Sequence, residues 1–171
     1  MAAPVAVALG APLDLVVPRK VGAPANPELG IGAVAPGVRV LDSELIARLG
    51  VSEAYVGSAV AEAEAEVVRR TRAYRDDRPP PDMMGRVAVL VDDGIATGST
   101  ALAAAAWARA AGAARVVLAV PVAPRQILDE LRREVDELIV VLAPERFLAV
   151  GQWYERFDQV SDEEVRAALG I

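Results

Sequence analysis

The chain has 171 residues, 54% of them hydrophobic, and a formal net charge of −6 at neutral pH, which suits one α/β domain rather than a disordered chain. The negative charge argues against bulk attraction to nucleic acid or to an anionic membrane. The sequence contains no Cys and no His, which excludes disulfides, thiolate metal sites and every histidine-based catalytic triad. Any catalysis must therefore rest on positioning, on electrostatics or on carboxylates.

The first 17 residues are apolar but lack the pattern of a signal peptide. No basic residue opens them, and Pro4, Pro12 and Asp14 interrupt the apolar run. No apolar run in the sequence is long enough to span a bilayer. We therefore expect a cytoplasmic protein that binds neither membranes nor nucleic acid.

Short elements are predicted at the start of the chain. Residues 2–9 indicate the end of a helix that stops at the following glycine. Residues 13–17 predict a short strand that a proline ends. Arg19 and Lys20 follow, either as cations that meet a ligand or as a solvated strand end.

A hairpin is predicted further along. Residues 21–27 are rich in Gly and Pro and predict a loop. Residues 31–35 and 38–41 predict two strands, because Pro36 and Gly37 between them are turn residues.

Two helices are then predicted. Ser43 should cap a short helix that ends at Gly50, and Ser52 should cap a longer one over residues 53–75. Apolar residues at helical spacing predict the buried face of the longer helix: Val56, Val60, Ala63, Val67 and Tyr74. Five arginines gather around the end of this helix: Arg69, Arg70, Arg72, Arg75 and Arg78. They could bind an anion, but the helix dipole and the overall acidity of the chain favour a solvated helix face.

The chain is organised around residues 87–100. Residues 87–91 are apolar and mostly β-branched, which predicts a strand buried on both faces. Asp92 and Asp93 follow, then small residues, then a predicted helix over residues 101–111. Gly94 and Gly98 let the backbone curl. The hydroxyls of Thr97, Ser99 and Thr100 offer a helix N-cap.

This arrangement has a specific chemistry. The loop should aim backbone N–H groups and a helix N-terminus at one point, which suits a phosphate. Two carboxylates beside it would repel a phosphate but accept hydrogen bonds from sugar hydroxyls, so a ribose 5-phosphate meets both requirements. No Lys follows Gly98, so the loop is not a Walker P-loop. The alternative is an ordinary strand–turn–helix joint with a polar cap, which leaves two adjacent acids unexplained.

The rest of the chain continues the alternation of strand and helix. Residues 116–120 and 138–142 predict strands, with a helix over residues 124–134 between them. This order predicts a doubly wound, mostly parallel sheet with helices on both faces, within one domain over residues 1–171.

Aromatic residues concentrate in the C-terminal segment 144–171. Stacking on a planar base or packing onto the core would each account for them, and the candidate base pocket is Phe147, Val150, Trp153 and Tyr154. Ser161 and Glu164 predict a capping box on a final short helix.

Residues 89–100, Val-Leu-Val-Asp-Asp-Gly-Ile-Ala-Thr-Gly-Ser-Thr, resemble the phosphoribosyl pyrophosphate (PRPP) signature of type I phosphoribosyltransferases. Residues 16–34, 147–154 and 159–164 are similar to a bacterial group within that family. The resemblance covers nearly the whole chain, and residues 92–100 are its most specific part.

The resemblance implies a transferase that moves ribose 5-phosphate from PRPP to a nitrogenous base, with Mg²⁺ held mainly through PRPP and with no direct protein metal site. It implies that Asp92 and Asp93 hold the ribose hydroxyls, that Arg19 and Lys20 meet pyrophosphate and that residues 21–36 form a mobile loop. The 5-phosphate would lie on the following residues: Gly94, Ile95, Ala96, Thr97, Gly98, Ser99 and Thr100.

The resemblance fails at the start of the chain. Members of the group begin with another helix and a strand whose Arg-Gly-Gly-type loop binds pyrophosphate, and Met1 follows the place of that loop. We expect residues 13–17 to slide beside the strand of residues 87–91, or the edge of that strand to stay open. An open edge favours self-association into a homo-oligomer, marginal stability and low activity. There are two alternatives to a transferase. One is a non-catalytic sensor of PRPP or a nucleotide, and the other is a non-catalytic remnant of the domain.

Overall fold

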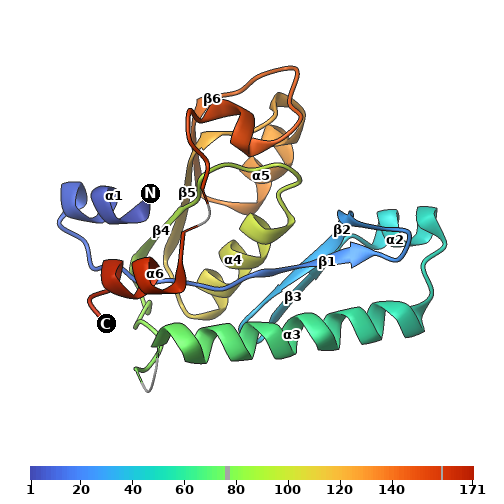
Figure 1. Ribbon diagram of the computed structural model, residues 1–171, viewed down its shortest axis with the longest axis horizontal. Helices are drawn as coiled ribbons and strands as arrows, with labels where there is room; N and C mark the ends of the chain where they lie inside the picture. The colour runs from blue at the N-terminus through green and yellow to red at the C-terminus, as the bar shows by residue number, and fades with distance from the viewer. Residues whose placement is uncertain (76–77, 159) are drawn as a thin grey trace.

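Two three-stranded sheets organise the computed structural model, which describes residues 1–75, 78–158 and 160–171 (Figure 1). The strands are β1 (Arg19–Ala23), β2 (Asn26–Ala35), β3 (Val38–Leu41), β4 (Val87–Val91), β5 (Arg115–Val122) and β6 (Glu137–Leu142). The helices are α1 (Ala2–Leu9), α2 (Ser43–Leu49), α3 (Glu53–Arg75), α4 (Ser99–Ala110), α5 (Leu128–Glu134) and α6 (Asp162–Ala168), with 3-10 turns η1 (Arg125–Ile127) and η2 (Val150–Trp153). Gln159, in the C-terminal part of the resemblance, lies outside the described residues.

The parallel sheet has the order β4–β5–β6. Val87 of β4 lies opposite Arg115 of β5, and Leu118 of β5 lies opposite Leu138 of β6. Helices α4 and α5 lie on one side of this sheet and α1 on the other (Figure 1). The predicted α/β class, with a parallel sheet flanked by helices, is confirmed.

Strand β4 differs from the prediction because it is an edge strand. Val87 and Val89 are 58% and 39% exposed, so β4 is not buried on both faces, and its second edge pairs with no strand of the described residues. Residues 13–17 form no strand. Residues 13–17 therefore do not pair beside β4, and the edge of β4 stays open, which is the second of the two outcomes expected from the sequence.

Residues 21–27, where the Gly and Pro content predicted a loop, instead lie mainly in β1 and β2, which pair as an antiparallel hairpin. The mobility that the resemblance implies for residues 21–36 stays a prediction. A Cβ on Gly22 would lie 2.8 Å from the Cα of Pro27, so the glycine permits a close approach of the two strands. The pairing shifts register on both sides of Gly22. The predicted hairpin of β2 and β3 is confirmed, with Gly37 at φ 72° in its turn.

The two faces of β2 join the two cores of the molecule. Ala33 and Ala35 belong to the core around α4 and β5. Ile31 and Val34 belong to the second core, which they form with apolar residues of α3. Three of the α3 residues predicted to be buried are buried: Val60, Ala63 and Val67.

Among helices α2, α3 and α6, the predicted serine N-cap is confirmed at two. Ser161 and Glu164 form the predicted capping box of α6, and Ser52 accepts a hydrogen bond from the amide of Tyr55 at the start of α3. At α2 the prediction is wrong, because Asp42 rather than Ser43 accepts from the amide of Leu45. Both residue types are good caps, and the chain enters the helix one residue earlier than the pattern indicated.

The arginines at the end of α3 divide into two kinds. Arg69 and Arg70 both pair with Glu66 on the helix surface. Arg75 is only 8% exposed and donates to the carboxylate of Asp14 and to the carbonyls of Leu15 and Pro79. Arg75 therefore ties the segment after α1 to the end of α3.

We predict that Arg75→Ala lowers the free energy of unfolding by roughly 2–3 kcal/mol, because it removes several charge-assisted hydrogen bonds and leaves Asp14 without its partner. Arg69→Ala is the matched control and should cost less than about 1 kcal/mol, since its ion pair is exposed. Urea unfolding of both variants measures the difference. Equal losses would contradict the role given to Arg75.

Candidate functional site

The loop after β4 is held on the carboxyl end of β5. The amide of Asp92 donates to the carbonyl of Ala119 at 3.4 Å, and the amide of Ile95 donates to the carbonyl of Val122 at 3.0 Å. The Ile95 side chain is 3% exposed and lies in the core. The loop is therefore pinned at its start and at its middle, and the two acids lie at the edge where parallel α/β sheets bind ligands.

The two glycines of the loop are required for different reasons. Gly98 has φ 86°, a left-handed conformation that β-branched residues avoid, as the sequence predicted. Gly94 has no positive φ. A Cβ there would lie 2.7 Å from Cγ1 of Val150 and 2.9 Å from Cγ1 of Val122. Gly94 is needed for close packing and not for a curled backbone.

The N-terminus of α4 carries no side-chain cap from the described residues. The N-cap is Gly98, which has no side chain. Ser99 and Thr100 lie inside the first turn and do not cap it, so the predicted hydroxyl cap is wrong. The first amides of a helix are unpaired within the helix and lie at its positive end. An anion placed there would be favoured.

Asp92 and Asp93 carry no side-chain ion pair within the described part of the chain. The amide of Asp93 donates to Oδ1 of Asp92 at 2.9 Å. The protein packed around Asp92 raises the pKa of its carboxyl, and the Asp93 charge raises it further. Burial also raises the pKa of Asp93, while the amino group of Met1 and nearby amides lower it. No side-chain cation of the described residues neutralises either carboxylate, so both could engage sugar hydroxyls or a metal cation.

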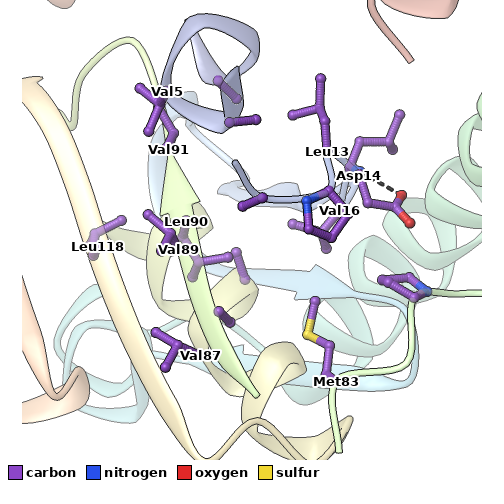
Figure 2. A pocket seen from close by; sticks show the side chains of 18 of the residues that line it. Val5, Leu13, Asp14, Val16, Met83, Val87, Val89, Leu90, Val91 and Leu118 are labelled. Atoms are coloured by element: carbon purple, nitrogen blue, oxygen red, sulfur yellow. Dashed lines mark hydrogen bonds between the residues drawn. The ribbon is translucent and has the colours of Figure 1, made fainter. Parts of the chain in front are cut away.

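A cavity of about 500 Å³ follows the open edge of β4, with Asp92 and Thr100 among its lining residues. Its walls are mainly apolar side chains. Figure 2 shows Val5 of α1 beside Val91, with Leu13 and Val16 across from β4.

A second cavity of about 690 Å³ lies on another side of the loop and is lined in part by Thr97 and Ser99. Four acids surround it, with Arg109 as the one cation among its lining residues: Asp42, Glu44, Glu130 and Glu134. This acidic lining makes the second cavity the less suitable of the two for an anion.

Lys20 and Arg19 were predicted to act together, but they lie on opposite faces of β1. Lys20 lies opposite Ala33, which faces α4, while Arg19 lies opposite Val34, which faces α3. A Cβ on Gly30 would lie 3.3 Å from the Lys20 stem and 3.4 Å from Oγ of Ser99. The structure thus brings Lys20 close to the first turn of α4 and turns Arg19 away.

The Lys20 ammonium is engaged within its own hairpin. Its Nζ lies 2.9 Å from the carboxylate of Glu28 and 3.1 Å from the carbonyl of the same residue. Glu28 is exposed, so this pair is weak enough for an anionic ligand to replace it.

The C-terminal segment packs on the loop through two of its four candidate residues. Val150 contacts Gly94, and the Tyr154 hydroxyl donates to the carbonyl of Asp93. Phe147 and Trp153 instead stack on each other, with ring centroids 6.5 Å apart and an interplanar angle of 18°. Sequence spacing carried no signal for the Tyr154–Asp93 contact, because 61 residues separate the two.

Comparison with known proteins identifies the family. The profile described as "Phosphoribosyl transferase domain" matches residues 1–147. The chain belongs to this family, which confirms the resemblance seen in residues 89–100.

Two proteins of Mycobacterium tuberculosis, from strains CDC 1551 / Oshkosh and ATCC 25618 / H37Rv, each bear the name "Putative phosphoribosyl transferase" and are 45% identical to the chain over 166 residues. The match covers 96% of the chain and 38% of each relative, so the chain spans about two fifths of their length. The crystal structure of TT1426 from Thermus thermophilus is similar with a TM-score of 0.79 at 40% identity, over 98% of the chain and 80% of that protein.

Within the described part of the chain, no helix is long and apolar enough to cross a membrane. The same residues contain no group of three or more acidic, His or Cys side chains arranged to hold a metal ion.

We predict that Gly94→Ala lowers the free energy of unfolding by about 1–3 kcal/mol, because its methyl group overpacks the contact with Val150 and Val122. Gly57→Ala is the matched control. Gly57 lies in α3 with nothing within 4 Å of an added Cβ, so alanine there should stabilise by roughly 0.5–1 kcal/mol. Thermal and urea unfolding measure both variants, and a neutral Gly94→Ala would show that the loop can shift away.

Proposed function

We propose that the chain binds PRPP with Mg²⁺ and transfers ribose 5-phosphate to a nitrogenous base, releasing pyrophosphate. The observation that carries this proposal is the uncapped N-terminus of α4 beside two carboxylates that have no side-chain cation, as far as the described residues extend. The helix end suits the 5-phosphate, and Asp92 and Asp93 suit the ribose hydroxyls.

The proposed chemistry needs no strong base at the sugar. A nitrogen of the acceptor forms the bond to C1 of the ribose, and the bond from C1 to pyrophosphate breaks with its electron pair on the leaving oxygen. Positive charge develops on the sugar as this bond breaks. The protein contributes by positioning the two reactants and by placing negative charge near the sugar, which agrees with a sequence that has no His.

The two carboxylates also fit a role toward Mg²⁺, because hard cations prefer oxygen ligands. Asp92 and Asp93 are two ligands at most, and no third acid joins them within the described chain. These residues therefore fit a Mg²⁺ ion whose ligands are mainly oxygens of the substrate. When bound, Mg²⁺ would neutralise negative charge on the pyrophosphate. Lys20, next to the first turn of α4, is the cation we assign to the same group.

The alternative is a non-catalytic module that binds PRPP or a nucleotide, and the open edge of β4 favours it. The cavity along this edge reaches Asp92, and no strand of the described residues pairs with β4 on that side. PRPP binding without pyrophosphate release would identify this alternative. Screening purines, pyrimidines and other nitrogenous acceptors for PRPP-dependent pyrophosphate release tests the transferase.

We predict that Asp92→Asn combined with Asp93→Asn weakens PRPP binding by at least about 2 kcal/mol, because charge-assisted hydrogen bonds to the ribose are lost while the side-chain shape is kept. Calorimetry with PRPP and Mg²⁺ measures the change. Glu53→Gln combined with Glu62→Gln on the exposed face of α3 removes the same charge and should leave affinity unchanged. Wild-type affinity in the double Asn variant would refute the proposed ribose site.

We also predict that Gly98→Val weakens ribose 5-phosphate binding by roughly 1–3 kcal/mol, since valine is strained at positive φ and its side chain would crowd Leu131. Thr97→Ala should have a smaller effect. Unfolding curves show whether each variant is folded, and titration with ribose 5-phosphate gives the affinities. Two equally mild variants would show that the loop is only a structural turn.

A further inference from the structure

One peptide group of the loop, between Asp93 and Gly94, is held from two sides. Its carbonyl oxygen accepts a hydrogen bond from the Tyr154 hydroxyl. Its N–H, on Gly94, stabilises the charged form of the Asp93 carboxylate and so acts to lower the pKa of that group. A rotation of this peptide plane would break the Tyr154 hydrogen bond and change the ψ angle of Asp93, the residue that carries the carboxylate. The orientation of the peptide and the position of the carboxylate are therefore linked.

Packing on Gly94 holds the same peptide. Its Cα lies between Val150 of the C-terminal segment and Val122 of β5, so closely that a Cβ would meet both at under 3 Å. The amide of Ile95 is bonded to the carbonyl of Val122. The valines limit translation of the peptide, and the Tyr154 hydroxyl limits its rotation.

The Tyr154 ring has its own support. It packs against Phe157 with ring centroids 5.2 Å apart, and Phe157 in turn lies against Gly151, where a Cβ would come within 3.0 Å of the ring. Burial and the charges of Asp93 and Asp92 raise the pKa of the Tyr154 hydroxyl, so it remains a donor at neutral pH. The hydroxyl is already used by the loop and is not free to bind a base.

We infer that Tyr154 is a positioning residue whose hydroxyl, by holding the Asp93 carbonyl, orients the Asp93 carboxylate toward the ribose hydroxyls. The inference rests on the proposed function for its ligand, PRPP. It changes the role of Tyr154 from a wall of the base pocket to a support of the sugar site. It also makes the C-terminal segment part of the ribose site, although that segment is distant from the signature in the sequence.

The test is a double-mutant cycle on PRPP affinity, with the variants Tyr154→Phe, Asp93→Asn and both together. Tyr154→Phe keeps the ring against Phe157 and removes only the hydroxyl, and should weaken PRPP binding about five- to tenfold, the equivalent of one hydrogen bond. In the Asp93→Asn background the same change should cost less than about twofold, because coupled residues are non-additive. Equal losses in the two backgrounds, or no loss at all, would overturn the inference.

Tyr74→Phe is the matched control, because the Tyr74 hydroxyl bonds to Asp162 between α3 and α6 and not to the loop. It should leave PRPP affinity unchanged. A readout without ligand is the hydrogen exchange of the Gly94 amide, which should become severalfold faster in Tyr154→Phe and stay at the wild-type rate in Tyr74→Phe. If the wild-type chain binds no PRPP, the proposed function fails, and an unchanged Gly94 exchange rate separately overturns the positioning role.

Discussion

The candidate site depends on the backbone hydrogen bonds between the loop after β4 and the carboxyl end of β5. Strand β5 is the central strand of the parallel sheet and the best buried, with Val116, Leu118 and Val120 between 0% and 3% exposed. Its carbonyls at Ala119 and Val122 hold the loop at its first residue, Asp92, and at Ile95. A strand packed on both sides moves little, so it can fix the acids and the start of α4 in one geometry.

The second constraint is β2, whose two faces belong to different cores. Alternation of side chains along a strand sends Ala33 and Ala35 toward α4 and Val34 toward α3. Small residues on the α4 side let the hairpin come close to the first turn of that helix. Because β1 follows the same alternation, Lys20 lies on the α4 side of the hairpin and Arg19 on the α3 side.

The open edge of β4 is the weak point of this architecture. An unpaired strand edge offers its backbone groups to other chains, and Val87 and Val89 remain exposed. The structure partly covers this edge with α1 and the segment after it, and the ion pair between Arg75 and Asp14 holds that segment in place. The cavity that remains adjoins Asp92, so the stability of this side of the molecule and access to the candidate site are linked.

Much of the site could be predicted from the sequence because its signals are local. Two acids after an apolar strand, a run of small residues and a helix are adjacent in the chain, and residues 89–100 carry them in one short stretch. The helices α3 and α6 were predictable for the same reason, since caps and apolar periodicity act within a few turns. The family was recognisable from this one stretch.

Other features depended on contacts between distant segments. The content of Gly and Pro predicted a loop over residues 21–27, but pairing between β1 and β2 outweighed those weak local preferences. The apolar residues of β4 predicted burial on both faces, yet burial depends on which neighbours a strand has, and β4 has one among the described strands. The sequence by itself determined the signature loop, its acids and the family, because these follow from local chain chemistry. Only the tertiary structure decided that Lys20 and not Arg19 approaches α4, that Gly94 is required by Val150 and that Tyr154 holds Asp93, because packing and hydrogen bonding between residues far apart in the chain set those contacts.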